Sequence, residues 1–95
     1  MRWTWDLAKA GANLKKHKVS FELAARVFGD PFSITVPDPC LEEERWRTIG
    51  KPSTDFPVLL FVVHTWPDDD EEEPVGRIIS ARRAQAHERK QYEKG

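Results

Sequence analysis

The chain has 95 residues, enough for one small domain, and its single cysteine, Cys40, excludes an internal disulfide. The first residues form no apolar segment, and no run approaches the roughly 18 apolar residues of a membrane span. We therefore expect a cytoplasmic protein that is neither exported nor inserted into a membrane.

The net charge is −1, but it is unevenly distributed: residues 1–40 hold six Lys and Arg against four Asp and Glu, residues 41–74 three against ten, and residues 75–95 six against two. Two basic ends flanking an acidic middle permit a local basic surface that a phosphate backbone could meet.

The N-terminal third predicts a strand followed by two helices. Residues 3–5 favour a short strand, after which Asp6 can cap a helix. The apolar residues of this first helix recur at helical spacing and are Leu7, Ala10, Gly11 and Leu14. Ser20 can cap a second helix, whose apolar stripe consists of Phe21, Ala24, Ala25 and Phe28, and Gly29-Asp30-Pro31 ends it.

A basic cluster closes the first helix, with Lys15, Lys16, His17 and Lys18 in succession. Cations at this position complement the negative end of the helix macrodipole. The same cations can instead contact phosphate groups. From the sequence alone, the two explanations are about equally supported.

The middle of the chain predicts strands. Residues 32–36 alternate between apolar and polar and stop at Pro37. Residues 45–49 alternate as well, so that Arg45 and Arg47 project from one face if Trp46 faces the core. The apolar run 58–63 is typical of a strand buried on both faces, and we expect it to be the central strand of the sheet.

The acidic run 68–73 is expected to form a solvated connection between strands, because it lacks the spacing of a calcium-binding loop. Residues 76–79 predict the last strand. Ser80 can then cap a closing helix over residues 81–93, whose sparse apolar stripe is formed by Ala81, Ala84 and Tyr92.

This assignment places Arg82 and Arg83 in the first turn of the closing helix, where cations oppose the macrodipole. Together with the free N–H groups of that turn they would form an anion site. The alternative is that both side chains simply point to solvent.

Six segments in order resemble the BrnT toxin family of bacterial type II toxin–antitoxin systems, over nearly the whole chain. They are Trp3-x-Trp5-Asp6, Asn13-x-x-Lys16-His17-x-Val19-Ser20-Phe21, Phe28-x-Asp30-Pro31, Glu43-Glu44-Arg45-Trp46-x-x-Ile49-Gly50, Val62-Val63-His64-Thr65 and Arg77-Ile78-Ile79-Ser80-Ala81-Arg82-x-Ala84-x-x-x-Glu88-Arg89-x-x-Tyr92.

The resemblance implies a single BrnT-like toxin domain over residues 1–95 with a RelE-like α+β fold: two N-terminal helices, a twisted, mainly antiparallel sheet and a C-terminal helix. It also implies a ribonuclease that stops translation. The implied partner is a BrnA-type ribbon-helix-helix antitoxin, which forms a hetero-oligomer with the toxin. The complex is expected to bind operator DNA only through the antitoxin.

Cleavage of RNA can use the 2′-OH of the substrate as nucleophile, so it needs proton transfer and cations at the phosphate but neither a metal nor another cofactor. His17, in the Lys-His motif of the family, is the first candidate for proton transfer, because an unperturbed imidazole titrates at about 6.5. We assign catalysis to His17, Lys16, Glu44 and Arg82, and RNA binding to Lys15, Lys18, Arg45, Arg47, Arg77 and Arg83.

Other candidates have ordinary structural explanations. Glu43 or Glu44 can act as a base, but orienting an arginine is the commoner role. His64 follows the central strand and is more often a hydrogen-bonded core residue than a catalyst, and His87 is expected on the surface. Tyr92 can stack on a base, although core packing is favoured.

The alternative function is a weakly active or inactive module that binds the antitoxin and supports operon repression, which the acidic loop favours.

Overall fold

The structure is a computed structural model and describes residues 2–40, 42–66 and 72–95. Its elements within these ranges are, in chain order, β1 (Arg2–Thr4), α1 (Leu7–His17), α2 (Phe21–Ala25), the 3₁₀ helix η1 (Arg26–Gly29), β2 (Ile34–Pro37), β3 (Trp46–Gly50), β4 (Leu60–His64), β5 (Val75–Arg83) and α3 (Ala86–Lys94). The predicted α+β class is therefore confirmed. No helix in the described ranges combines the length and the apolar character of a membrane span.

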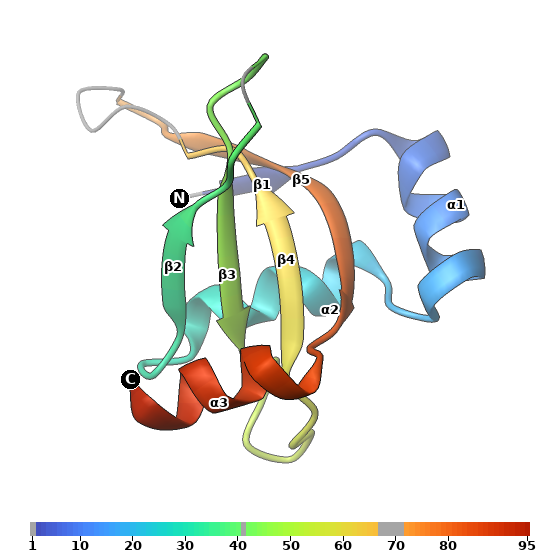
Figure 1. Cartoon of the computed structure of the whole chain (residues 1–95). Coiled ribbons are helices and arrows are strands. Elements are labelled where there is room, and N and C mark those ends of the chain that lie inside the picture. The colour runs from blue at the N-terminus through green and yellow to red at the C-terminus, as the bar shows by residue number, and fades with distance from the viewer. Residues whose placement is uncertain (1, 41, 67–71) are drawn as a thin grey trace.

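The strands form one mixed sheet in the order β1-β5-β4-β3-β2. β1 pairs with β5 in parallel, and the other neighbouring pairs are antiparallel. Figure 1 shows α2 behind the sheet, α3 crossing in front of its lower end and α1 standing beside β5. The sheet therefore has one face covered by α2 and another that is left open above α3.

β4 is the central strand, as predicted. Its burial alternates, however: Leu60, Val62 and His64 are buried, whereas Phe61 and Val63 are only half-buried. The expectation of a strand equally buried on both faces is thus only partly met, because α2 covers one face and α3 reaches just the end of the other.

The main core lies between the sheet and α2. Ser20 caps α2 by accepting a hydrogen bond from the Leu23 N–H at 3.1 Å, as expected. Phe21 and Ala24 of the predicted stripe are fully buried. The core cluster consists of Val19, Phe21, Ala24, Val27, Leu60, Val62, Ile78 and Ala81. Burial of this apolar surface fixes α2 against β4 and β5.

The apolar stripe predicted for α1 is wrong at Leu7 and Leu14, although Ala10 packs against the main core. Asp6 caps the helix as expected, accepting from the Lys9 N–H at 3.0 Å. Leu7, however, is 82% exposed and Leu14 is 48% exposed, while Asn13 is the buried residue of the helix. α1 lies beside the edge of β5, where backbone groups need hydrogen-bond partners, and an amide side chain meets that need where a leucine cannot.

The C-terminal boundary also differs from the prediction. Residues 80–83 belong to β5 and pair with residues 60–63 of β4, so Ser80 caps no helix. α3 begins only at Ala86, behind a capping box formed by Gln85 and Glu88. Arg82 and Arg83 are therefore strand residues, and the anion site predicted at a helix N-terminus does not exist. Pairing with the central strand outweighs the local preference for a helix.

Two further expectations concern the edge strand and the acidic run. β2 begins at Ile34 and includes Pro37, which is tolerated because β2 lies at the sheet edge. Phe32 precedes the strand in a turn and is 73% exposed. The acidic connection falls mainly on residues 67–71, which lie outside the described residues, whereas Glu72 and Glu73 are exposed.

Candidate functional site

Two arginines meet over an aromatic ring on the open face of the sheet. The Arg82 guanidinium carbon lies 4.1 Å from the centroid of the Phe61 ring, and that of Arg47 lies 5.7 Å from it. Arg82 is the direct neighbour of Phe61 across the β4–β5 pair, and Arg47 projects from the same face of β3. Strand alternation thus brings together cations that are 35 positions apart in the sequence.

Carboxylates hold both guanidinium groups in place. Arg82 donates to the two oxygens of Glu88 at 2.8 Å each, and the Arg47 Nε donates to Asp38 at 2.6 Å. Burial by itself raises the pKa of Glu88, but hydrogen bonds from Arg82 and from the Gln85 N–H outweigh it and hold the pKa below its ordinary value. The Arg82–Glu88 pair therefore remains charged near neutral pH.

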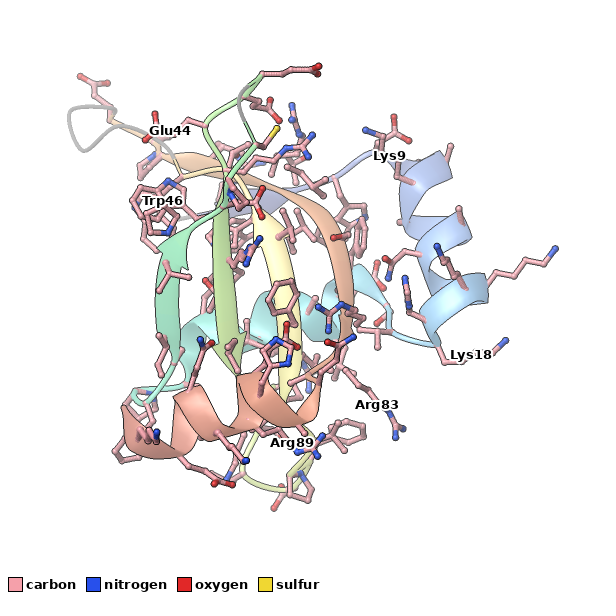
Figure 2. The ribbon with its side chains drawn as sticks, in the orientation of Figure 1. Lys9, Lys18, Glu44, Trp46, Arg83 and Arg89 are labelled. Atoms are coloured by element: carbon pink, nitrogen blue, oxygen red, sulfur yellow. The ribbon has the colours of Figure 1, made fainter. Side chains whose placement is uncertain are left out.

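A second pair of arginines shares one carboxylate. Arg77 donates to both oxygens of Glu43, at 2.6 and 2.8 Å, and the Arg45 Nε donates to it at 3.1 Å. Hydrogen bonds from Arg77, and then from Arg45, lower the pKa of Glu43. Glu43 therefore takes the orienting role. Glu44 is exposed, and Figure 2 shows it at the opposite side of the molecule from Lys18, so the structure does not bring it to the end of α1.

The basic end of α1 is attached to β5 through Asn13. Its amide nitrogen donates to the Ala81 carbonyl at 2.8 Å and to the Val19 carbonyl at 3.0 Å, and its oxygen accepts from the Ala81 N–H at 3.1 Å. His17 follows four residues later on the same face of the helix and is half-buried. Lys18 ends the helix in the left-handed conformation, with φ 61°.

This attachment places the predicted residues in two groups. The end of α1 carries Lys15, Lys16, His17 and Lys18, of which the three lysines are exposed. β5 carries Arg82 and Arg83 directly after the Ala81 that Asn13 binds. Figure 2 shows Lys18 and Arg83 on the α1 side of the molecule. His17 and Lys16 therefore lie on a helix that is attached to β5 at Ala81, the residue before Arg82, and Glu44 lies apart from the end of α1.

His64 is a core residue and not part of an exposed site. Its ring is fully buried, and its Nδ1 lies 2.9 Å from the Thr65 carbonyl, which can only accept, so Nδ1 carries the proton. Burial lowers the pKa of His64, although the bond to Thr65 opposes this. The neutral Nε2 then accepts from the Thr48 hydroxyl at 2.6 Å, which in turn accepts from Thr35 at 2.8 Å. The aromatic rings around it belong to Trp3, Phe28 and Trp66.

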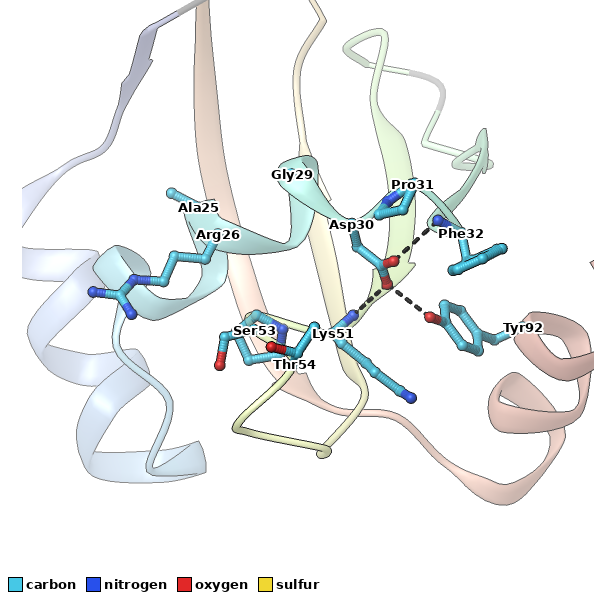
Figure 3. A pocket seen from close by; sticks show the side chains of 11 residues that line it. Ala25, Arg26, Gly29, Asp30, Pro31, Phe32, Lys51, Ser53, Thr54 and Tyr92 are labelled. Carbon is cyan, nitrogen blue, oxygen red and sulfur yellow. Dashed lines mark hydrogen bonds between the residues drawn. The ribbon is translucent and has the colours of Figure 1, made fainter.

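A pocket of about 780 Å³ opens where the end of η1, the segment after β3 and α3 meet (Figure 3). Asp30 ties these segments together, accepting from the Phe32 and Lys51 N–H groups at 3.0 and 2.9 Å and from the Tyr92 hydroxyl at 2.8 Å. Burial and the bond to Asp30 raise the pKa of Tyr92 to about 12. Tyr92 also packs against the cluster of Ile49, Leu59 and Ala84, so its favoured role in packing is confirmed.

No site role was expected for Asn13, Asp30 or Phe32. Asp30-Pro31 served as a helix-stop signal and as part of a family segment, and Asn13 lies outside the predicted apolar stripe of its helix, so no local pattern indicated that its side chain binds β5. Among the described residues, no group of three or more His, Cys, Asp or Glu is arranged to hold a metal ion.

The fold and site define a small α+β protein whose mixed sheet presents arginines from β3 and β5 beside a basic helix end. A family model described as the ribonuclease toxin BrnT of a type II toxin–antitoxin system matches residues 5–88. The chain therefore belongs to the BrnT family of ribonuclease toxins, as the resemblance implied, and membership in a type II system implies an antitoxin partner. No curated protein matches the chain.

Proposed function

We propose that the protein is a metal-independent endoribonuclease that inhibits translation, and that its substrate lies over the open sheet face and the basic end of α1. The observation that carries this proposal is the convergence of Arg47 and Arg82 over Phe61, beside the helix end that presents His17. Planar guanidinium groups suit the two-oxygen geometry of a phosphate. We also propose that the fold is RelE-like, as the family resemblance implies.

In the proposed reaction the 2′-OH of the RNA attacks the adjacent phosphorus. A bond forms between O2′ and phosphorus and the bond from phosphorus to O5′ breaks, leaving a 2′,3′-cyclic phosphate and a 5′-OH. The 2′-OH gives up one proton, and the leaving O5′ takes one. His17 takes part in this proton transfer, with Lys16 beside it, while Arg82 stabilises the charge on the phosphorane oxygens.

The carboxylates hold the arginines ready for the substrate. Glu88 occupies two of the N–H groups of Arg82, so a phosphate must use the remaining donors or displace the carboxylate. Arg45, Arg47, Arg77 and Arg83, with Lys15 and Lys18, extend the cationic surface along the RNA. We assign no step to Glu44, because it lies away from the end of α1.

The partner that controls this activity is, in our proposal, a BrnA-like ribbon-helix-helix antitoxin. It forms a hetero-oligomer with the toxin in the cytoplasm, and the complex reaches operator DNA only through the antitoxin. A protein that covers the open face or the end of α1 would block access of RNA to both groups of cations.

The test is cleavage of a synthetic RNA by the purified protein in excess EDTA, after induced expression has been scored for growth arrest. We expect arrest, and products that end in a 2′,3′-cyclic phosphate. Folded protein that gives neither arrest nor cleavage would overturn the nuclease assignment for this member.

One observation favours a second candidate, a weakly active or inactive module that binds the antitoxin and supports repression. Four of the candidate RNA-contacting arginines each pair with a carboxylate, which reduces the positive charge available to RNA; they are Arg45, Arg47, Arg77 and Arg82. This candidate predicts a stable complex with the antitoxin and no cleavage, so the same assay separates the two.

A further inference from the structure

The pocket beside Asp30 presents an exposed aromatic ring, that of Phe32. Phe32 is 73% exposed and lines the pocket together with Tyr92. Figure 3 shows both rings at the same end of the pocket. No stacking contact joins these two rings in the part of the chain that the structure describes, so the Phe32 ring remains available to a ligand.

The neighbouring groups give this pocket a positive lining. The Lys51 ammonium lies 5.9 Å from the centroid of the Tyr92 ring, and Arg26 lines the far side of the pocket. The acidic group, Asp30, already accepts three hydrogen bonds, two from backbone N–H groups and one from Tyr92. Its carboxylate therefore holds the Tyr92 ring in place.

A second pocket, of about 440 Å³, shares Lys51 and Tyr92 with the first and continues to Arg83 and Arg89. Together the two pockets form what we call the basal groove, defined by Arg26, Phe32, Lys51, Tyr92, Arg83 and Arg89. The groove ends at Arg83, the last residue of β5, so it runs from the exposed Phe32 ring to the end of the strand that also carries Arg82.

We propose that the basal groove binds single-stranded RNA next to the cleavage site, with a nucleobase stacked on Phe32 and Tyr92 and with Lys51 on the adjacent phosphate. This inference rests on the proposed ribonuclease function and adds a substrate subsite to it. Aromatic rings in a cationic groove are the arrangement by which proteins hold single strands without reading their sequence. The charge of the groove favours a polyanion over a protein segment, because four cations, Arg26, Lys51, Arg83 and Arg89, line it against two carboxylates, Asp30 and Glu93.

The experiment measures binding of a fluorescein-labelled 2′-O-methyl RNA of about 12 nucleotides, a length suited to such grooves, by anisotropy. The 2′-O-methyl group removes the nucleophile, so binding is read without cleavage. We expect Phe32→Ala to raise Kd about tenfold, which is within the effect of losing one stacked base. We expect Lys51→Gln to lower the slope of log K against log salt by about 0.7, the value for one phosphate on a single strand.

Matched control variants show whether an effect is specific to this subsite or follows from removing any exposed aromatic or cationic side chain. Phe56→Ala removes another exposed phenylalanine, 40% exposed and outside the groove, and should leave Kd unchanged. Lys9→Gln removes an exposed lysine of α1 and should leave the salt slope unchanged. Thermal melting of all four variants confirms that each is folded.

The outcomes distinguish the subsite from the nuclease assignment. If the wild type cleaves RNA but Phe32→Ala binds as tightly as Phe56→Ala, the subsite is refuted and the nuclease stands. If Phe32→Ala weakens only the complex with the antitoxin, the groove belongs to that protein and our proposal is wrong. If the wild type neither cleaves RNA nor binds the 2′-O-methyl oligonucleotide, both proposals fail.

Discussion

Helices α1 and α2 follow each other in the chain, and a side chain caps each of them, Asp6 for α1 and Ser20 for α2. They are attached to the sheet by different means. α2 buries Phe21 and Ala24 in the main core, whereas α1 packs only the half-buried Ala10 against that core, is held mainly by the amide of Asn13 and leaves Leu7 exposed. Apolar burial fixes a helix along its length, while a single amide fixes it at one point.

This difference bears on function. A helix that is attached mainly through one side chain keeps most of its surface accessible to a ligand. The basic residues Lys15, Lys16 and His17 lie about one turn after Asn13, the attached residue. His17 follows Asn13 by four residues, so the amide that fixes α1 also fixes where His17 stands relative to β5. The attachment of α1 is thus part of the candidate site, whereas that of α2 serves stability.

The largest expected effect tests the attachment of α2. Phe21→Ala leaves a cavity in the main core and should lower the free energy of unfolding by about 3–5 kcal/mol. The measurement is urea or thermal unfolding followed by circular dichroism. A loss below about 1 kcal/mol would mean that α2 is not held by apolar burial.

The next effect tests the attachment of α1. Asn13→Ala leaves the Ala81 N–H and carbonyl and the Val19 carbonyl without their partner, and should cost about 2–3 kcal/mol. Amide hydrogen exchange gives the sharper readout, since the Ala81 N–H should lose its protection. Retained protection at Ala81 would contradict the assignment of Asn13 as the residue that pins α1.

A smaller effect concerns the ion pair that joins Glu88 of α3 to Arg82 of β5. The pKa of Glu88 is lowered in the folded state, so its contribution is complete above the pKa of the unfolded carboxyl, about 4.3, and is lost as pH falls through the folded value. Glu88→Gln should therefore cost about 1–2 kcal/mol at pH 7 and progressively less in acid. Glu93→Gln, on an exposed residue of the same helix, is the control. A cost for Glu88→Gln that does not shrink in acid would exclude the charged pair as its cause.

The smallest effect completes the comparison of the two helices. Leu7→Ala removes an 82% exposed side chain and should change the free energy of unfolding by less than about 0.5 kcal/mol. Equilibrium unfolding under the conditions used for Phe21→Ala checks this. A cost near that of Phe21→Ala would show that Leu7 is buried in solution.

Local signals predicted much of the fold. The caps at Asp6 and Ser20, the stripe of α2 and the central position of β4 are properties of short stretches, and the structure has them. Two errors share one cause. The stripe of α1 and the boundary of α3 depend on β5, which takes Asn13 as a partner at one edge and pairs with β4 at the other. Periodicity within a helix contains no information about such distant partners.

The candidate site was only partly predictable for the same reason. Alternation correctly predicted that Arg47 and Ile49 share one face of the strand, because it depends only on the strand itself. The sequence could not decide whether Glu43 or Glu44 orients an arginine, because the answer depends on the position of Arg77 in β5, which donates to Glu43. The basal groove requires three separated segments to meet at Asp30, and the sequence alone gives no distance between them.

The central claim is that the end of α1 takes part in RNA cleavage through His17. The most direct measurement is the initial rate of cleavage of a synthetic RNA in excess EDTA by the wild type, His17→Ala and His87→Ala. His87 is an exposed histidine of α3 and serves as the matched control. We predict that His17→Ala lowers the rate by about 10²–10⁴-fold, the usual contribution of a proton-transfer group, and that His87→Ala leaves it unchanged. A His17→Ala protein that cleaves as fast as the wild type would contradict the account.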